Sequence, residues 1–193
     1  ENILFKISFP AEFHAQTAVE AAVKLHSEIK DKVDQIKSIN ITTHESAIRI
    51  ISKVGSLNNP ADRDHCLQYM VAIALLKGNL VAEDYEDSVA KDPRIDVLRG
   101  KMIVNEDKRY SKEYLEADKR SIANRIQIHF NDGTSTEDCE VEYPIGHMRR
   151  REEGIPVLEK KFMNNLNITY TEEVANKIFK PVSYTHLTLP TSY

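Results

Sequence analysis

A carboxylate, an imidazole and a phenol recur at helical spacing in the first half of the chain. Asp62, His65 and Tyr69 are separated by three and four residues, so on one helix they would share a face. Such a group suits general acid–base chemistry. A structural interpretation stays open beside it, in which Asp62 or Asp64 caps the helix and His65 and Tyr69 hydrogen-bond to each other.

A basic run lies further along the chain. Residues 146–154 read GHMRRREEG. Arginine binds carboxylates through paired N–H donors, so His147, Arg149 and the next two arginines are candidates for holding a tricarboxylate. The alternative is a solvated face in which the two following glutamates neutralise the arginines. No aromatic or glycine-rich platform accompanies the run, which argues against nucleic-acid binding.

Polar donors also gather near the start of the chain, where a predicted strand leads into a helix. Because helix N-termini attract anions, these side chains could form an anion site. Equally, the lysine could be the polar face of an edge strand, and Glu12 or the threonine a helix cap. The donors are Lys6, His14, Gln16 and Thr17.

Composition favours an ordinary globular domain. The 193 residues are 41% hydrophobic and 29% charged, with a net charge of -4, which gives no overall attraction to nucleic acid or acidic membranes. The longest apolar run, residues 70–76, is too short to span a bilayer. Dinucleotide, Walker, HExxH and nucleophile-elbow motifs are absent from the sequence. The two cysteines fit neither a disulfide framework nor a metal cluster, and we expect no cofactor.

Hydrophobic periodicity predicts an α+β fold with a small mixed sheet and packed helices. Gly78 is expected to end the central helix, and Pro93 to begin another. The predicted strands are 3–9 and 33–41 plus a hairpin of 122–130 with 140–143 around an Asn-Asp-Gly turn, and the predicted helices are 17–30, 45–52, 62–77, 82–90, 93–101, 151–165 and 171–179.

Both ends of the chain carry signs of processing. The first residue is not Met and no signal-peptide pattern follows it, so we expect an internal cut point. Residues 181–193 contain no Asp, Glu, Lys or Arg and continue no periodicity. They resemble translated sequencing-adapter sequence, and we expect residues 182–193 to be a non-native tail without a functional role.

Six segments together resemble the C-terminal half of MmgE/PrpD proteins over residues 1–181. They are FKISFPAEFHAQTAVEAA, ADRDHCLQYMVAIALLKG, AEDYED, DPRIDVLRGKM, NDGT and YPIGHMRRREEGIP. The resemblance implies a smaller α/β domain at residues 1–148 and, at 149–181, a helical segment that returns to a separate helical domain. Most catalytic histidines and acids would lie in that other domain, so this chain alone should be inactive.

The function implied by the resemblance is a cytoplasmic, homodimeric hydro-lyase of propionate breakdown in the methylcitrate cycle. It would remove water from 2-methylcitrate to give 2-methyl-cis-aconitate, without an iron–sulfur cluster. Other activities in the family, such as decarboxylation of cis-aconitate or epimerisation of a dicarboxylate, are alternatives. A non-catalytic carboxylate-binding module, docking a partner through the arginine run, is a further alternative from another class.

The resemblance also assigns residues. The family's lysine before a Tyr/Phe-Pro turn falls on Lys6, and its tyrosine in a Ser-Leu-Pro-Tyr-like helix falls on Tyr69, where this chain reads Cys-Leu-Gln-Tyr. A histidine of many relatives aligns with Gln16, and His14 is its expected substitute. The departure at Glu12 from the histidine of the decarboxylase argues against decarboxylation. We further expect Arg63 to supply positive charge and His65 or Tyr69 to donate a proton.

Overall fold

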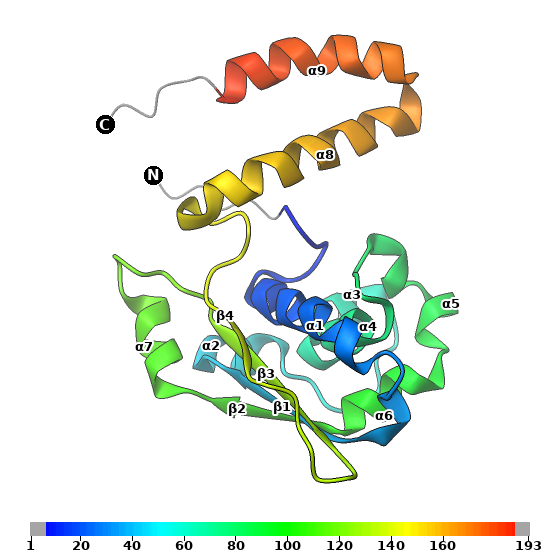
Figure 1. Ribbon diagram of the computed structural model, residues 1–193, viewed down its shortest axis with the longest axis vertical. Helices are drawn as coiled ribbons and strands as arrows, with labels where there is room; N and C mark the ends of the chain where they lie inside the picture. Colours follow the sequence, from blue (N-terminus) through cyan, green and yellow to red (C-terminus); the bar gives the residue numbers. More distant parts are fainter. Residues whose placement is uncertain (1–6, 188–193) are drawn as a thin grey trace. The chain divides into compact units, whose positions relative to one another are not determined.

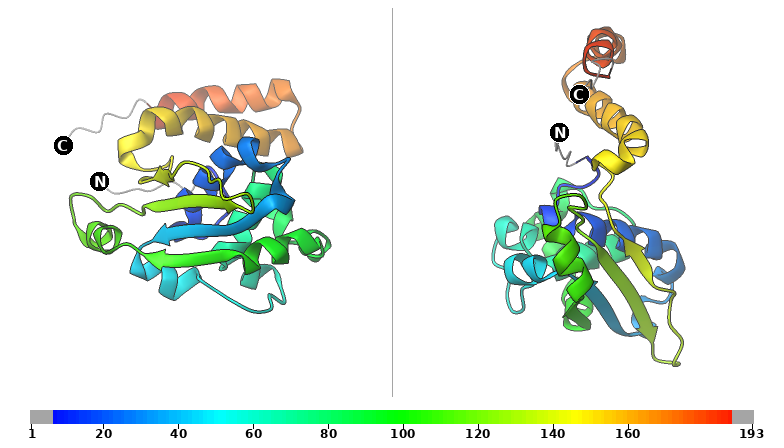
Figure 2. Two further views of the ribbon diagram at one scale, coloured as in Figure 1. Left: turned by 60° about the horizontal axis from the view of Figure 1, so that its bottom comes forward. Right: turned by 90° about the vertical axis from the view of Figure 1, so that its left-hand side faces the viewer.

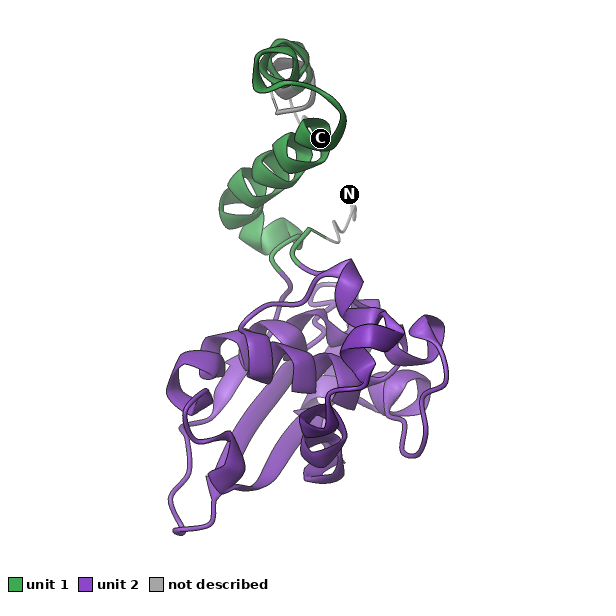
Figure 3. Ribbon diagram, turned by 90° about the vertical axis from the view of Figure 1, so that its right-hand side faces the viewer, with its two compact units in different colours: residues 1–8, 145–193 green, residues 9–144 purple. Residues whose placement is uncertain are grey.

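The chain divides into two compact units. The computed structural model describes the backbone of residues 7–187 and the side chains of residues 7–182. Residues 9–144, here called the sheet unit, form one compact body, and residues 1–8 with 145–193, the helical unit, form the other (Figure 3). Together the described elements make an α+β fold built around a mixed sheet, which confirms the predicted fold class.

The sheet has the strand order β2-β1-β3-β4 (Figure 1). Strand β1 (Ile36–Thr43) runs parallel to β2 (Met102–Glu106) and antiparallel to β3 (Asn124–Phe130), which pairs in turn with β4 (Cys139–Val141). The hairpin is confirmed, whereas β2 was not predicted. Thr43 pairs with Glu106, and Thr42 pairs with Arg125. The C-terminal ends of β1 and β2 and the N-terminal end of β3 therefore lie side by side at the same end of the sheet.

Two helices build the core of the sheet unit. Helices α1 (Gln16–Ile29) and α4 (Leu67–Lys77) pack on each other and on one face of the sheet (Figure 2). Residues 67–75 of α4 are all buried, and the alanines of α1 allow close approach. Burial of this apolar surface is the main stabilising contribution to the unit.

Shorter helices connect these elements, and their starts follow local capping rules. Asp92 and Asp107 accept hydrogen bonds from backbone N–H groups two residues later, as N-caps do. Pro60 and Pro93 occupy the first helical position, as predicted for Pro93. These elements are η1 (Phe13–Ala15), η2 (Val33–Gln35), α2 (Glu45–Ile51), α3 (Pro60–Asp64), η3 (Ala82–Tyr85), α5 (Asp87–Ala90), α6 (Pro93–Gly100) and α7 (Lys108–Leu115).

The predicted helix over residues 62–77 is wrong in one respect. The structure contains two helices there, α3 and α4, because the chain leaves helical geometry at His65 and Cys66. Cys66 has an extended backbone, with φ -125° and ψ 105°. Gly78 ends α4 in the left-handed conformation, as predicted. Of the strand predicted at 3–9, residues 3–6 lie outside the described part of the chain, and residues 7–9 are irregular.

The helical unit contains η4 (Met148–Arg150) and two helices, α8 (Arg151–Thr169) and α9 (Glu172–Leu187). The rings of Phe162 and Phe179 lie 6.1 Å apart between these helices. Both helices extend beyond the predicted ends at 165 and 179, and α9 continues into the predicted tail. No helix of the described residues has the length and apolar character needed to cross a membrane.

Candidate functional site

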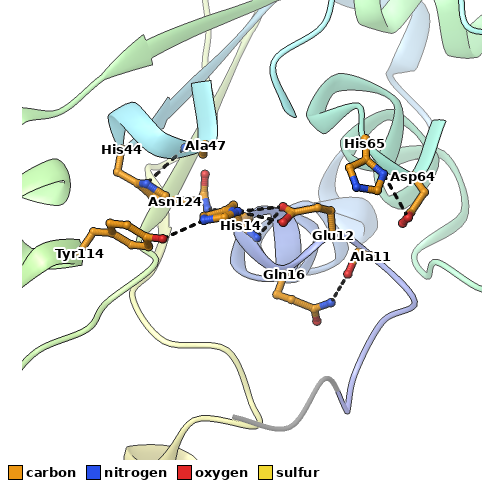
Figure 4. Close-up of polar contacts among 10 residues, drawn as sticks. All are labelled: Ala11, Glu12, His14, Gln16, His44, Ala47, Asp64, His65, Tyr114 and Asn124. Atoms are coloured by element: carbon orange, nitrogen blue, oxygen red, sulfur yellow. Dashed lines mark hydrogen bonds and ion pairs between the residues drawn. The ribbon is translucent and has the colours of Figure 1, made fainter. Parts of the chain in front are cut away.

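The centre of the candidate site is the imidazole of His14, in the short turn η1 that precedes α1. The Glu12 carboxylate accepts a hydrogen bond from the backbone N–H of His14 at 2.8 Å and lies 2.9 Å from its ring Nδ1 (Figure 4). A carboxylate only accepts, so Nδ1 carries a proton. The other ring nitrogen, Nε2, lies 3.1 Å from the Tyr114 hydroxyl. His14 thus has one nitrogen fixed by a carboxylate and the other on a phenol.

Buried polar contacts hold the backbone of His14 in place. The side-chain amide of Asn124, the first residue of β3, donates to the His14 carbonyl at 3.0 Å and to the Thr17 hydroxyl at 2.8 Å. Thr17 in turn donates to the carbonyl of Ile122. Asn124 and Thr17 are fully buried. The turn is therefore fastened to the sheet, which limits the movement of the imidazole.

A second histidine and Tyr114 complete the site. His44 follows the last residue of β1 and caps α2, because its Nδ1 accepts from the backbone N–H of Ala47 at 3.3 Å. Tyr114 lies on α7, the helix that follows β2. The rings of His44 and Tyr114 stack with centroids 4.6 Å apart and planes 10° apart, and the His14 ring lies 5.3 Å from that of His44.

His44 is a neutral imidazole at physiological pH. Its side chain is completely buried. Loss of hydration on burial, with a smaller effect of the neighbouring His14, lowers its pKa from 6.5 to about 4 against the opposing charge of Glu12. His14, by contrast, contacts a carboxylate through Nδ1 and a hydroxyl through Nε2. A proton can therefore be transferred at its Nε2.

The predicted acid–base cluster on one helix face does not form. The break between α3 and α4 separates its members. His65 is exposed and lies 3.4 Å from the carboxylate of Asp64, away from His14 (Figure 4). The Asp62 carboxylate accepts from the backbone N–H of Asn58 and from the side chain of Asn59. The structural interpretation is also wrong, because Asn59 and not Asp62 or Asp64 caps α3, and the Tyr69 hydroxyl donates to the Asp84 carbonyl and not to His65.

Arg63 and Tyr69 do lie together, around the turn η3. The Tyr69 hydroxyl donates to the carbonyl of Asp84 at 2.6 Å, and Arg63 donates to the carbonyl of Tyr85 at 2.6 Å while pairing with Asp87 at 2.7 Å. Both side chains are buried. Burial raises the pKa of Tyr69 to about 12. In the sheet unit these two predicted site residues fasten one loop to α3 and α4.

The other predicted residues are distributed over both units. Gln16 is buried and donates from Nε2 to the carbonyls of Phe9 and Ala11, both at 2.9 Å, so it holds the segment before η1. Lys6 lies outside the described residues. His147 caps η4 by accepting from the backbone N–H of Arg149, and both belong to the helical unit. Arg149 is exposed.

Sequence reasoning missed two members of the site. Tyr114 lies on a helix that the periodicity does not predict, and His44 is not among the residues that the sequence analysis singles out. A usable signal was present for His44, since it lies between a predicted strand that ends at residue 41 and a predicted helix that begins at residue 45. For Tyr114 the sequence offers no comparable signal, because its partner His14 is 100 positions away.

A separate pocket of about 350 Å³ lies at the opposite end of the sheet, where β2 begins. Lys53, Ser56, Arg99 and Met102 contribute to its wall, and among described residues its lining includes none of the predicted site residues. Within the described part of the chain, no group of three or more His, Cys, Asp or Glu side chains is arranged to hold a metal ion. The chemistry available at the His14 site is proton transfer and hydrogen bonding.

Comparison with known proteins places this geometry in a family context. A protein of Yarrowia lipolytica named 2-methylcitrate dehydratase, mitochondrial, is 58% identical over 181 residues, covering 92% of this chain and 35% of that protein. The 2-methylcitrate dehydratase of Escherichia coli is 58% identical over 169 residues, covering 86% of this chain and 35% of the relative. A 2-methylcitrate dehydratase-like protein, oryR, of Aspergillus oryzae is 39% identical, covering 94% and 38%.

The chain spans little more than a third of the length of these curated relatives. Residues 9–182 match the family description "MmgE/PrpD C-terminal domain". That range contains Glu12, His14, His44 and Tyr114, so the whole candidate site lies within the matched domain. The chain belongs to the MmgE/PrpD family and carries its C-terminal domain.

Proposed function

We propose that this chain is the C-terminal part of a 2-methylcitrate dehydratase, a hydro-lyase that converts 2-methylcitrate into 2-methyl-cis-aconitate and water. One observation carries the proposal: the chain is 58% identical, over about nine-tenths of its length, to a relative with that name. The His14 site supplies a proton-transferring group, which such an elimination requires.

The reaction requires two proton transfers and cationic groups that bind the substrate carboxylates. A base takes the proton from the carbon next to a carboxylate, the hydroxyl on the neighbouring carbon leaves with a proton from an acid, and cations hold the carboxylates as charge develops. Because Glu12 holds the Nδ1 proton of His14, we assign one of the two transfers to Nε2. Lys6, Arg63, His147 and Arg149 remain the proposed partners of the substrate carboxylates.

A chimera tests the function directly. Residues 9–182 of this chain would replace the matching segment of the Escherichia coli relative, so that the rest of that protein is present. We expect the chimera to dehydrate 2-methylcitrate, measured by the ultraviolet absorbance of the unsaturated product. His14→Gln in the chimera should lower kcat/KM at least about a hundredfold, since a proton-transferring group typically contributes that much or more.

The opposite result is equally clear. A chimera that is folded and binds 2-methylcitrate but forms no product would contradict the dehydratase proposal. Release of carbon dioxide from cis-aconitate would instead identify a decarboxylase. Tricarboxylate binding by the chain alone, measured by calorimetry and unchanged in the chimera, would favour a carboxylate-binding module.

The wider properties of the longer protein belong to the same proposal. We place the boundary of the returning helical segment at residues 149–181, supported by the exposed apolar side chains of Ile155, Ile168 and Val174. We also propose a cytoplasmic homodimer that binds neither nucleic acid nor membrane, consistent with the net charge of -4. Because one relative is named as mitochondrial, cell fractionation with an antibody to this chain checks the compartment, and light scattering checks the dimer.

A further inference from the structure

We propose that Tyr114 shares the Nε2 proton of His14 and presents it to the substrate side, and that His44 is the positioning residue that holds Tyr114 there. The inference rests on the proposed function, because it concerns the same site. It assigns the phenol of the site to Tyr114, in contrast to Tyr69, whose hydroxyl is already donated to the Asp84 carbonyl inside the core.

A hydrogen bond joins the imidazole of His14 to the hydroxyl of Tyr114. With Nδ1 protonated against Glu12, a neutral His14 accepts the Tyr114 hydroxyl proton at Nε2, and a protonated His14 donates to the Tyr114 oxygen. The 3.1 Å contact survives in both states, and its direction reverses. A hydroxyl can donate and accept at once, so Tyr114 can pass a proton on while keeping its contact with His14.

The side chains of Tyr114 and His14 differ in their exposure to solvent. His14 is 8% exposed, whereas Tyr114 is only half-buried. Of the two side chains, Tyr114 therefore has the larger surface open to a ligand. Glu12, on the other ring nitrogen of His14, is also only partly buried, so this difference concerns Tyr114 and the His14 ring alone.

The ring of Tyr114 is held in position by His44. His44 uses Nδ1 to accept from Ala47 at the start of α2, which leaves the proton on Nε2 and fixes the ring plane. Tyr114 stacks on that fixed plane at 4.6 Å. The start of α2 is also tied to α7, because the backbone N–H of Glu45 donates to the Ser111 hydroxyl at 2.8 Å. His44 thus gives Tyr114 a rigid surface.

The charge state of His44 suits this role. Among the described residues, the ionisable side chains around its ring are His14 from η1, Glu12 from the N-cap of η1 and Tyr114 from α7. A charged His44 would repel a proton on His14, but burial keeps His44 neutral. Its buried Nε2–H has no hydrogen-bond partner among the described residues. The stack is therefore the main contact through which the His44 ring acts on Tyr114.

Three variants separate the roles of hydroxyl, stack and cap. Tyr114→Phe keeps the ring and removes the hydroxyl. His44→Asn keeps a good N-cap and removes the stack, whereas His44→Phe keeps an aromatic surface and removes the cap. The first readout is the imidazole nitrogen NMR signals of His14 in this chain, assigned by their loss in His14→Gln. Circular dichroism of each variant checks folding.

The expected pattern is specific. Tyr114→Phe should move the Nε2 signal of His14 and leave Nδ1 nearly unchanged, because Glu12 still holds Nδ1. His44→Asn should move Nε2 in the same direction, and His44→Phe should restore a spectrum close to the original. An unchanged Nε2 signal in folded Tyr114→Phe overturns the shared proton. Equal spectra for the original chain and folded His44→Asn overturn the positioning role.

The second readout is catalysis by the chimera. Tyr114→Phe should lower kcat about tenfold or more while KM stays within about twofold. His44→Asn should follow it, and His44→Phe should retain more activity. If the original chimera is folded and binds 2-methylcitrate but forms no product, the proposed function fails and the NMR pattern still decides the contact. If it is active and Tyr114→Phe keeps kcat within about twofold, the role of Tyr114 fails and the function stands.

Discussion

The Nε2 atom of His14 lies 3.1 Å from the hydroxyl of Tyr114, although 100 positions separate the two residues in the chain. The pairing of β1 with β2 produces this contact. His44 follows the end of β1 and α7 follows the end of β2, and the two parallel strands end side by side. The backbone of His14 lies at the same end of the sheet, because the side-chain amide of Asn124, at the start of β3, donates to the His14 carbonyl.

Glu12 is expected to set the reactivity of His14. Glu12→Gln keeps an oxygen that can accept from Nδ1 but removes the negative charge that stabilises a protonated imidazole. We predict that kcat of the chimera falls at least about tenfold. The matched control is Glu28→Gln, the same change at an exposed position of α1. Equal activity of the two variants would contradict the carboxylate role.

Burial of His44 should make stability depend on pH. The unfolded chain binds a proton at this side chain as the pH falls below 6.5, whereas the folded chain does so only near pH 4. Between these values the unfolded state holds more protons, so the free energy of unfolding falls as the pH falls. The contribution of the neutral His44 to the free energy of unfolding is fully present above pH 6.5. Its loss at lower pH lowers that free energy by about 3 kcal/mol at most.

Urea unfolding at several pH values measures this effect. Asparagine does not titrate, so in His44→Asn the decline of unfolding free energy between pH 6.5 and pH 4 should be shallower than in the original chain. The two proteins will differ in stability at neutral pH because the variant also loses the stack. The slopes are therefore compared, and parallel pH curves would contradict a neutral buried His44.

Local patterns predicted much of the fold. The periodicity over residues 17–30 matches α1, and Gly78 ends α4 as expected. Strand β2 escaped prediction because it lies at an edge of the sheet, where its side chains are half-buried or exposed without a clear apolar face. The break between α3 and α4 escaped for another reason: residues 65 and 66 have no helix-breaking side chain, and tertiary contacts decide their backbone.

The candidate site was less predictable than the fold. His14 was singled out for its place at a helix start, and the structure gives that residue a carboxylate and a phenol. The phenol could not be found from spacing, because the contact depends on which strands pair. The Asp62, His65 and Tyr69 cluster shows the reverse problem. Its spacing is helical, but it assumes a continuous helix that the chain does not form.

Tyr69 can be tested for both structure and catalysis. Its hydroxyl is buried and donates to the Asp84 carbonyl, so Tyr69→Phe should lower the free energy of unfolding by about 1–2 kcal/mol. Tyr85→Phe is the control, because the buried hydroxyl of Tyr85 has no partner among described residues. That change should be nearly neutral or stabilising.

The same variant tests the catalytic prediction for Tyr69. If its phenol acts in the reaction, Tyr69→Phe should lower kcat/KM of the chimera well beyond twofold, after correction for the folded fraction. A value within about twofold, which is well under 1 kcal/mol of transition-state stabilisation, removes Tyr69 from the mechanism.

Gly78 is expected to be the most sensitive glycine of the sheet unit. Its φ is +70°, and an added Cβ would lie 2.6 Å from the His26 ring. That ring cannot move freely, because His26 Nδ1 is hydrogen-bonded to the Leu75 carbonyl at 2.8 Å. Gly78→Ala should therefore cost about 1–2 kcal/mol for the left-handed backbone, plus a further 1–3 kcal/mol or so for overpacking.

Gly55→Ala separates the two contributions. Gly55 also has a positive φ, +92°, but an added Cβ there meets nothing within 4 Å. Urea unfolding of both variants should show a modest loss for Gly55→Ala and a larger one for Gly78→Ala. Since backbone strain is common to both, the difference reports the contact with His26. Equal losses would mean that the His26 ring gives way, and that the contact between α1 and the end of α4 is looser than the hydrogen bond to Leu75 implies.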